Sequence, residues 1–347
     1  MGGERVALSR RRFLLAVPLT GLGAACTGST HAVRGAASPV EIASSSPPGA
    51  AKGTILVAMP ETVQTREVWS GLEDELGGDY RLVAVRIEGP QAQSDLAAAL
   101  ARYQPNGVVL MNNPTVAAYR AYQEQCGLKQ FPPAVVVMTS FFDGHPTLVA
   151  SATGISYEVP LITAVTNLRK VIVAPMERIG VIHRPPQRGY VQRQAALAAR
   201  EQITVVAQEV GASPNFSEIK WALRKLKRRI DALWVLNDDH LLSPRLIADG
   251  WLPGLNEPPS CPTIVGAAAL VSPRQSFGTF AVLPDHTALG VQAAGILFEL
   301  AENNWSLPPD AQVQLPLSTT TTLDFVQARD HFPLRADALQ HVDHVLE

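Results

Sequence analysis

The chain has 347 residues, 17% of them charged, and a formal net charge of −2. This balance leaves no excess of basic residues to attract a nucleic acid, so we exclude nucleic acid as a partner. Three cysteines, none of them in a C-x-x-C pair, exclude a small disulfide-stapled scaffold. We expect Cys126 and Cys261 to be small buried side chains, with a disulfide between them as the alternative in an oxidising compartment.

Residues 1–26 have the pattern of an export signal, in which basic residues lead into a short apolar stretch, Phe13 to Ala25. This stretch is shorter than the roughly 20 apolar residues that a membrane-spanning helix needs. The run Ser9-Arg10-Arg11-Arg12-Phe13-Leu14 resembles the twin-arginine pattern, with Leu15 where lysine is common. We therefore expect a periplasmic or cell-envelope protein. Without the signal its net charge is near −5, because the signal carries four arginines and one glutamate.

Cys26 ends the signal and follows Leu22-Gly23-Ala24-Ala25, which is similar to a bacterial lipoprotein processing site. Gly23 departs from that pattern, because a branched aliphatic residue is usual at its position. Two alternatives stay open: Cys26 carries a lipid that anchors the protein to the membrane, or it does not. Residues 27–52 are rich in Ser, Gly, Ala, Thr and Pro without apolar periodicity, which predicts a flexible linker and a folded body from about Gly53.

About 295 residues follow the linker, which is too many for one ordinary core and suits two lobes with a cleft. Short apolar runs alternate with amphipathic stretches, which predicts an α/β fold with two lobes of parallel strands joined by crossover helices. The first half is expected to have strands at 54–59, 81–87, 107–111, 134–138 and 147–150 and helices near 63–76, 94–104 and 114–125. The second half is expected to have strands at 178–183, 203–208, 232–236, 263–266 and 278–282 and helices near 188–200, 217–230 and 285–303.

Two of these helices have recognisable first residues. Asn113 before Pro114 predicts an N-cap, and so does Ser217 before Glu218. The helix near 217–230 has an apolar stripe formed by Ile219, Ala222, Leu223, Leu226 and Ile230. Its other face is expected to be solvated, with a docking patch as the alternative, and carries Lys220, Arg224, Lys225, Lys227, Arg228 and Arg229.

Three passages of the body carry a family resemblance. They are Gly154 to Leu161 with the later Glu177 to Ile182, Phe216 to Ile219 with Ile230 to Val235, and Gly278 to Val282 with Gly290 to Ala294. Together they resemble the ABC-transporter substrate-binding proteins whose characterised members take up tryptophan or tyrosine. The similarity covers roughly residues 53–335 and is best from 154 onward. It implies a type I periplasmic-binding fold, in which two doubly wound parallel-sheet lobes joined by three crossings hold the ligand between them. Lobe 1 would comprise 53–156 plus 286–305, and lobe 2 would comprise 157–285 plus 306–347.

The polar run Asn237-Asp238-Asp239-His240 follows the strand expected at 232–236. Ligands of such sheets lie beyond the carboxyl ends of the strands, so the run falls on the cleft side. Ligand contact by Asn237 and Asp238 and capping of the next helix are the main alternatives. No second cluster of His, Cys or carboxylate with metal-ligand spacing lies nearby, so we disfavour a metal site or acid–base catalysis.

The same geometry and the resemblance place further ligand-binding candidates at the other strand ends and crossings: Glu61, Thr62, Asn112, Ser140, Phe141, Tyr157, His183, Arg184, Arg188, Tyr190 and Asp285. Several have alternatives. Asn112 is preferred over Asn113 for ligand contact. Phe141 and Tyr157 form either an aromatic wall or hinge packing. Arg188 binds a carboxylate or is merely exposed, and Asp285 accepts a ligand ammonium or caps the last long helix.

Two departures from the family pattern bear on the ligand. The chain has Gly266-Ala267-Ala268-Ala269 where family members often place polar or acidic residues, and the loop Ser140-Phe141-Phe142-Asp143 is also altered. A cleft with fewer hydrogen-bonding groups favours a more apolar ligand.

The leading hypothesis is an extracytoplasmic binding protein that captures an amino-acid-like or small aromatic molecule and delivers it to the permease and ATPase subunits of an ABC importer. The alternative is a sensor that reports its ligand to a membrane signalling receptor. An enzyme is disfavoured, because the chain has no G-x-S-x-G, H-E-x-x-H or P-loop motif. We expect no cofactor.

Overall fold

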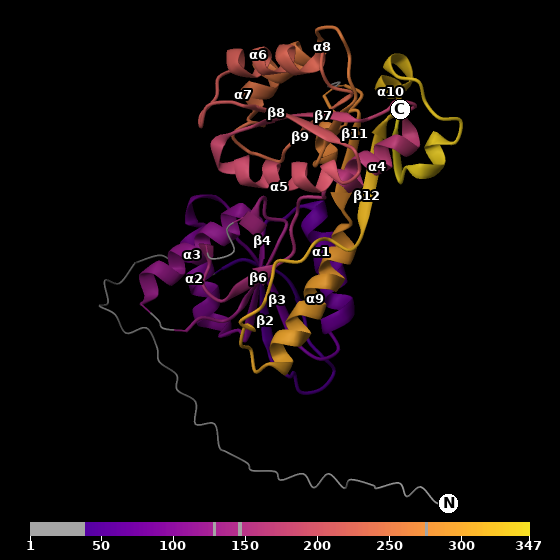
Figure 1. The fold of residues 1–347 in the computed structure, drawn as a ribbon. Coiled ribbons are helices and arrows are strands. Elements are labelled where there is room, and N and C mark those ends of the chain that lie inside the picture. Colours follow the sequence, from indigo (N-terminus) through magenta and orange to yellow (C-terminus); the bar gives the residue numbers. More distant parts are fainter. Residues whose placement is uncertain (1–38, 128–129, 145–147, 275–276) are drawn as a thin grey trace, which may run out of the picture. The chain divides into compact units, whose positions relative to one another are not determined.

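The computed structural model describes residues 39–127, 130–144, 148–274 and 277–347. The expected signal and Cys26 lie outside these ranges. The described chain forms two β-sheets with helices packed on them (Figure 1). None of the helices in these ranges combines the length and the apolar character that crossing a membrane requires.

Sheet 1 has six strands in the order β1-β3-β2-β4-β5-β6, all parallel except β1, which runs antiparallel to β3. Its central strands are apolar along their whole length because cores lie on both faces. The strands are β1 (Glu41–Ser45), β2 (Thr54–Met59), β3 (Arg81–Arg86), β4 (Gly107–Met111), β5 (Ala134–Val137) and β6 (Ala152–Gly154). The helices that pack on it are α1 (Val63–Leu76), α2 (Ala92–Tyr103), α3 (Asn113–Cys126) and α9 (His286–Glu302).

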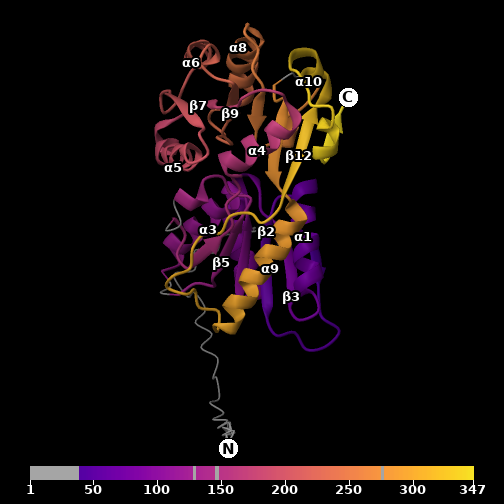
Figure 2. The same cartoon turned by 45° about the vertical axis from the view of Figure 1, so that its right-hand side comes forward.

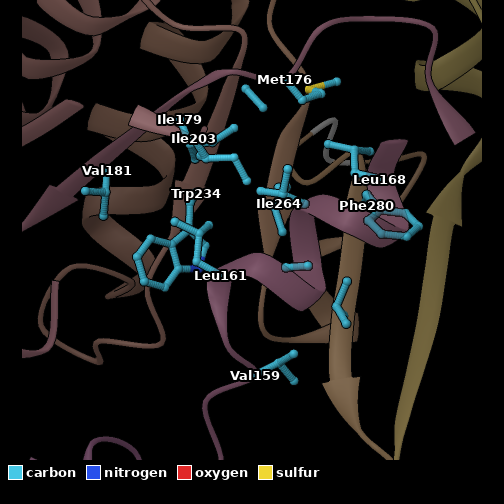
Figure 3. Close-up of a cluster of buried hydrophobic side chains, with 14 of the residues drawn as sticks. Val159, Leu161, Leu168, Met176, Ile179, Val181, Ile203, Trp234, Ile264 and Phe280 are labelled. Atoms are coloured by element: carbon cyan, nitrogen blue, oxygen red, sulfur yellow. The ribbon is translucent and has the colours of Figure 1, made fainter. Parts of the chain in front are cut away.

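Sheet 2 has seven strands in the order β13-β12-β11-β10-β9-β7-β8, parallel except where β12 runs antiparallel to β11. One of its two cores is drawn in Figure 3, where Trp234 of β9 and Phe280 of β11 are among the buried side chains. The strands are β7 (Arg178–His183), β8 (Thr204–Glu209), β9 (Ala232–Val235), β10 (Thr263–Val265), β11 (Phe280–Pro284), β12 (Thr319–Asp324) and β13 (His344–Leu346). Its helices are α4 (Leu161–Val171), α5 (Arg188–Ala199), α6 (Phe216–Lys227), α7 (Pro244–Leu246), α8 (Leu252–Asn256) and α10 (Phe325–His331).

The chain passes between the sheets after β6, after β11 and again before β12. Helix α9 follows a strand of sheet 2 but packs beside α1 of sheet 1 (Figures 1 and 2). The two helices touch through glycines. A Cβ atom added to Gly71 would lie 2.2 Å from the backbone oxygen of Thr287, and one added to Gly290 would lie 2.2 Å from that of Val68.

The predicted α/β class with two largely parallel sheets is confirmed. The strands expected at 54–59, 107–111 and 178–183 match β2, β4 and β7. The strand expected at 147–150 is wrong in its described part, since residues 148–150 form a turn and β6 begins at Ala152. Val149 is nevertheless buried, because a short apolar run can enter a core without forming a strand.

Sheet 1 begins before the expected start at Gly53. Strand β1 lies in the predicted linker, where Ile42 and Ala43 pack against a core of sheet 1. An edge strand pairs through backbone groups that every sequence carries, so its Ser-rich composition gave no signal. After α9, Leu307 and Val313 still pack on the cores of sheet 1. The chain therefore returns to sheet 2 later than the expected boundary at 306.

Both predicted N-caps are displaced. The side chain that caps α3 belongs to Asn112, not to Asn113. The cap of α6 is Asn215, which forms a reciprocal capping box with Glu218, and Ser217 lies inside the helix. In both cases a neighbouring side chain of similar chemistry reaches the free N–H groups.

The predicted apolar stripe of α6 is confirmed, and all five of its members are buried in one core of sheet 2. Lys227, however, was wrongly assigned to the solvated face. It is buried, and its ammonium donates to the carbonyl oxygens of Gly254, Leu255 and Glu257 at the end of α8, where a helix leaves carbonyl groups without helical partners. Cys126 and Cys261 are both free thiols.

Candidate ligand-binding site

A cavity of about 500 Å³, the large cavity, is lined by residues of helix α1 and the loop after β5 on sheet 1, by residues of sheet 2 and by residues of the crossings. Its size lies within the range of pockets that bind small molecules. The residues include Gln64 and Glu67 of α1, Met138 after β5, Ala267 to Ala269 after β10, Tyr157 after β6, and Asp285 and His286 at the start of α9. The carboxyl ends of strands from both sheets therefore face one space.

A chain of three side chains borders the large cavity. The hydroxyl of Tyr157 lies 3.1 Å from Nε2 of His286, and Nδ1 of His286 lies 3.1 Å from Oε2 of Glu67. Burial lowers the pKa of His286 although Glu67 opposes the shift, and burial raises the pKa of Tyr157 to about 12. These three side chains therefore link α1, α9 and the first crossing. Tyr157 and His286 carry little charge at neutral pH, which leaves Glu67 as the charged member.

A second cavity, the small cavity, is lined by residues of β9, β10 and β11 and of the loops after β9 and β10, and it shares Tyr157 with the large one. It leaves about 20 Å³ for the centres of water-sized molecules, which is enough for about one such molecule. Aliphatic side chains form much of its wall. Its aromatic residues are Tyr157, Tyr190 and Trp234, and its polar residues are Glu158 and Asn237.

Glu158 is the only carboxylic acid among the described residues that line the small cavity, and it is 7% exposed. Its Oε2 accepts a hydrogen bond from the backbone N–H of Phe141 at 2.9 Å, whereas its Oε1 is buried and has no partner in the described part of the chain. Burial raises the pKa of Glu158 to about 8, and the nearby Asp143 adds to the shift. At neutral pH and without a ligand this carboxyl is therefore largely protonated.

Tyr190 of α5 is the second residue that lines the small cavity and has a buried polar atom without a partner among the described residues. It is 5% exposed, and its hydroxyl has no partner among the described residues. The rings of Phe141 and Trp234 lie 5.2 and 5.9 Å from its ring. Burial raises the pKa of Tyr190 well above its usual value, so its hydroxyl stays protonated.

The polar run 237–240 is divided between three surroundings. Asn237 lines the small cavity, and its Nδ2 donates to the carbonyl oxygen of Gly266 at 3.1 Å. Asp238 turns away and pairs with Arg184. Asp239 and His240 line a separate surface cavity beside the start of α6.

Each arginine around the small cavity is paired with a carboxylate. Arg184 binds Asp238 through two hydrogen bonds of 2.7 and 2.8 Å. In the same way, Arg188 of α5 binds Glu209 at 2.7 and 2.6 Å. Arg193 donates to Asp143 at 2.9 Å. None of these guanidinium groups lines either cavity.

The structure brings some of the predicted site residues together and leaves others apart. Tyr157, Tyr190, Asn237 and Asp285 line the cavities, and Phe141 lies next to the small one because its backbone N–H donates to Glu158. Ser140 lines neither cavity, and its backbone N–H donates to Asn113. The remaining side chains are engaged elsewhere: Glu61 pairs with Arg66 on the surface, Thr62 caps α1, Asn112 caps α3, His183 bonds to the carbonyl of Arg184, and Arg184, Arg188 and Asp238 form ion pairs.

Asp285 serves as the N-cap of α9, with Oδ1 accepting from the N–H of Ala288 at 3.0 Å, and it also borders the large cavity. The sequence analysis missed Glu158, Glu67, His286 and Trp234 as residues of the site. Glu158 stood in the resembling passage 154–161, and a carboxylate inside an otherwise apolar crossing was a signal that could have singled it out.

No protein-family model and no curated protein matches this chain. Solved structures do match it. The ABC domain from Streptococcus pneumonia in complex with L-Trp is 18% identical, with a TM-score of 0.54 over 84% of this chain and 100% of that one. A ligand-free, open substrate-binding protein with adhesive properties from Clostridium difficile is 13% identical, with a TM-score of 0.58 over 84% and 98%. A conserved domain protein from Vibrio cholerae is 16% identical, with a TM-score of 0.55 over 84% and 99%.

The chain has a type I periplasmic-binding fold. At these identities the likeness concerns the fold, and it confirms the fold that the resemblance implied.

Proposed function

We propose that this chain is an extracytoplasmic solute-binding protein. It captures a small molecule between its two lobes and delivers it, chemically unchanged, to the permease and ATPase subunits of an ABC importer. The observation that carries the proposal is the large cavity, to which both lobes and the crossings contribute residues. A ligand in that position contacts both lobes at once and therefore stabilises the closed arrangement relative to the open one.

The walls of the cavities suit an organic molecule with an apolar body. Met138, Leu283 and the three alanines after β10 form an apolar part of the wall of the large cavity, and the other lining residues, such as Gln64 and Thr320, are polar or aromatic. Such a wall fits the amino-acid-like or small aromatic ligand expected from the sequence. The structure from Streptococcus pneumonia with L-Trp supports the same choice, because its fold is similar.

Thermal-shift and calorimetric screening of residues 39–347 tests the binding function. Amino acids, amines, small aromatic acids and neutral aromatics are screened, and a ligand that binds only the folded chain raises the melting temperature by mass action. Ala267→Phe, which places a ring in the large cavity, is expected to abolish the shift. Ala51→Phe is the control, since Ala51 is exposed and precedes β2 at the opposite edge of sheet 1. An unchanged shift in Ala267→Phe, or no shift with any compound, contradicts the proposal.

Export and anchoring belong to the same proposal. Replacing Arg10 and Arg11 by lysine is expected to keep the full-length precursor in the cytoplasm, because the twin-arginine route reads both residues. Cys26→Ala is expected to move the mature protein from the membrane fraction to the soluble fraction. A membrane-bound Cys26→Ala variant would contradict the lipid anchor.

A further inference from the structure

Two polar oxygen atoms without partners belong to the small cavity. Oε1 of Glu158 and the hydroxyl of Tyr190 are buried and have no hydrogen-bond partner among the described residues, and both residues line that space. A buried polar atom that stays unpaired loses its hydrogen bonds to water without replacement, so proteins seldom keep two beside one cavity unless a guest group satisfies them.

The charges around the cavities favour a cationic guest. Glu158 lines the small cavity, and Glu67 and Asp285 line the large one, whereas no lysine or arginine is among the described lining residues of either. The nearby Arg184, Arg188 and Arg193 are already neutralised by Asp238, Glu209 and Asp143. A ligand carboxylate would therefore meet three carboxyl groups and no free guanidinium or ammonium group.

The size and the rings of the small cavity indicate which kind of cation. Its space for about one water-sized molecule fits a primary ammonium and excludes a trimethylammonium group. Tyr157, Tyr190 and Trp234 contribute aromatic rings to the wall, and aromatic rings attract cations that have lost their water.

We propose that Glu158 and Tyr190 hold the ammonium group of a primary amine, and that this ligand carries no carboxylate beside the amine. Oε1 of Glu158 accepts one N–H of the ammonium, and the oxygen of Tyr190 accepts another. The inference rests on the proposed function, because the apolar body of the amine would occupy the large cavity, which shares Tyr157 with the small one.

Binding of such an amine is coupled to a proton. The carboxyl of Glu158, with its pKa of about 8, is largely protonated at pH 7 before the ligand arrives. The ammonium stabilises the ionised carboxylate, so the proton leaves as the ligand binds. The phenols of Tyr157 and Tyr190 also line this cavity, and because burial raises the pKa of both, they stay neutral at pH 7. The other charged group near this carboxyl is Asp143, which is paired with Arg193 at 2.9 Å.

Isothermal titration calorimetry with four probes that share one phenylethyl body tests the inference. The probes are 2-phenylethylamine, L-phenylalanine, 3-phenylpropionate and 2-phenylethanol. Two further primary amines, tryptamine and butylamine, replace the phenyl ring with an indole and with an aliphatic chain. At least one amine is expected to bind at least about tenfold more tightly than its carboxylate-bearing or neutral counterpart. Titration in two buffers of different ionisation enthalpy at pH 7 is expected to show proton release with the amine only.

Glu158→Gln keeps the shape and removes the charge, so it is expected to weaken amine binding by at least about tenfold and to abolish proton release. Tyr190→Phe is expected to weaken binding by a smaller factor. Glu61→Gln is the control, because Glu61 is an exposed carboxylate outside both cavities. Thermal melting of each variant without ligand shows whether it folds.

The outcomes separate this inference from the proposed function. If L-phenylalanine, 3-phenylpropionate or another non-amine binds as tightly as the amines, the amine assignment is overturned while solute binding stands. If Glu158→Gln and Tyr190→Phe fold and bind an amine as well as the unmodified chain does, the small cavity holds only water and the assignment fails. If no compound of any class binds, the proposed function fails with it.

Discussion

Arg184 and Asp238 form a buried ion pair that joins the end of β7 to the loop after β9. Their side chains meet through two hydrogen bonds of 2.7 and 2.8 Å, and the residues are 9% and 3% exposed. Arg184 also donates to the carbonyl of Ala212 after β8, and Asp238 accepts from the N–H of His240. The pair thus ties together three loops at the carboxyl edge of sheet 2.

Asp238→Asn is expected to lower the free energy of unfolding by about 3 kcal/mol, because it leaves the Arg184 charge buried without a counter-charge. Chemical denaturation measures the loss. Asp239→Asn, at the exposed neighbouring position, is expected to change it by less than about 0.5 kcal/mol. Equal effects of the two substitutions would show that the ion pair is not what holds these loops.

The sequence predicted the neighbourhood of this pair but not its role. Parallel-strand topology places the residues after β7 and β9 at one edge of the sheet, and Arg184 and Asp238 were both expected there, as ligand-binding residues. Whether a charged side chain faces a ligand or a partner 54 positions away depends on rotamers and on the path of each loop. Those are fixed by packing, which alternating apolar runs do not encode.

Helix caps that were predicted one or two residues away from their observed positions have the same origin, because local packing decides them. Asn112 and Asn113 are adjacent amides, and the backbone conformation decides which of them caps α3 and which accepts from the N–H of Ser140. Strands β1 and β12 were missed because their Ser- or Thr-rich sequences pair through the backbone, and the edge strand β13 was missed because it has only three residues. The long apolar and amphipathic elements were predicted well because burial itself creates their pattern.

Asn112→Ala is expected to destabilise the chain by about 2 kcal/mol, because two costs add. The side chain that caps α3 is lost, and alanine must adopt the φ of 100° that Asn112 has. Asn112→Gly loses the same cap but accepts this backbone conformation, so it is expected to cost less than about 0.5 kcal/mol. Urea denaturation of the two variants compares them, and a glycine variant no more stable than the alanine variant would contradict the account.

Gly290→Ala is expected to cost about 3 kcal/mol, because its Cβ would lie 2.2 Å from the backbone oxygen of Val68 and would push α9 away from α1. Gly295 lies in the same helix, but an added Cβ there meets nothing within 4 Å. Gly295→Ala is therefore expected to stabilise the chain by about 0.5–1 kcal/mol through helix propensity alone. Thermal and chemical unfolding of both variants measures the contrast, and two changes of the same sign would argue against glycine-mediated contact between the helices.

Glu158 is expected to make stability depend on pH in an unusual direction. Burial raises its pKa from 4.5 to about 8, so between these values the folded chain holds a proton that the unfolded chain has released. The proton bound to Glu158 stabilises the folded chain, and this contribution is fully present below pH 4.5. It amounts to at most about 5 kcal/mol and is lost as the pH rises to about 8. Glu158→Gln removes the titrating group, so the free energy of unfolding of the variant minus that of the unmodified chain is expected to rise between pH 5 and 8. Other groups that titrate in this range, such as His286, cancel in that difference. A flat difference across the range would mean that the Glu158 carboxyl is already ionised in the folded chain, and the proton release expected on amine binding would then be absent as well.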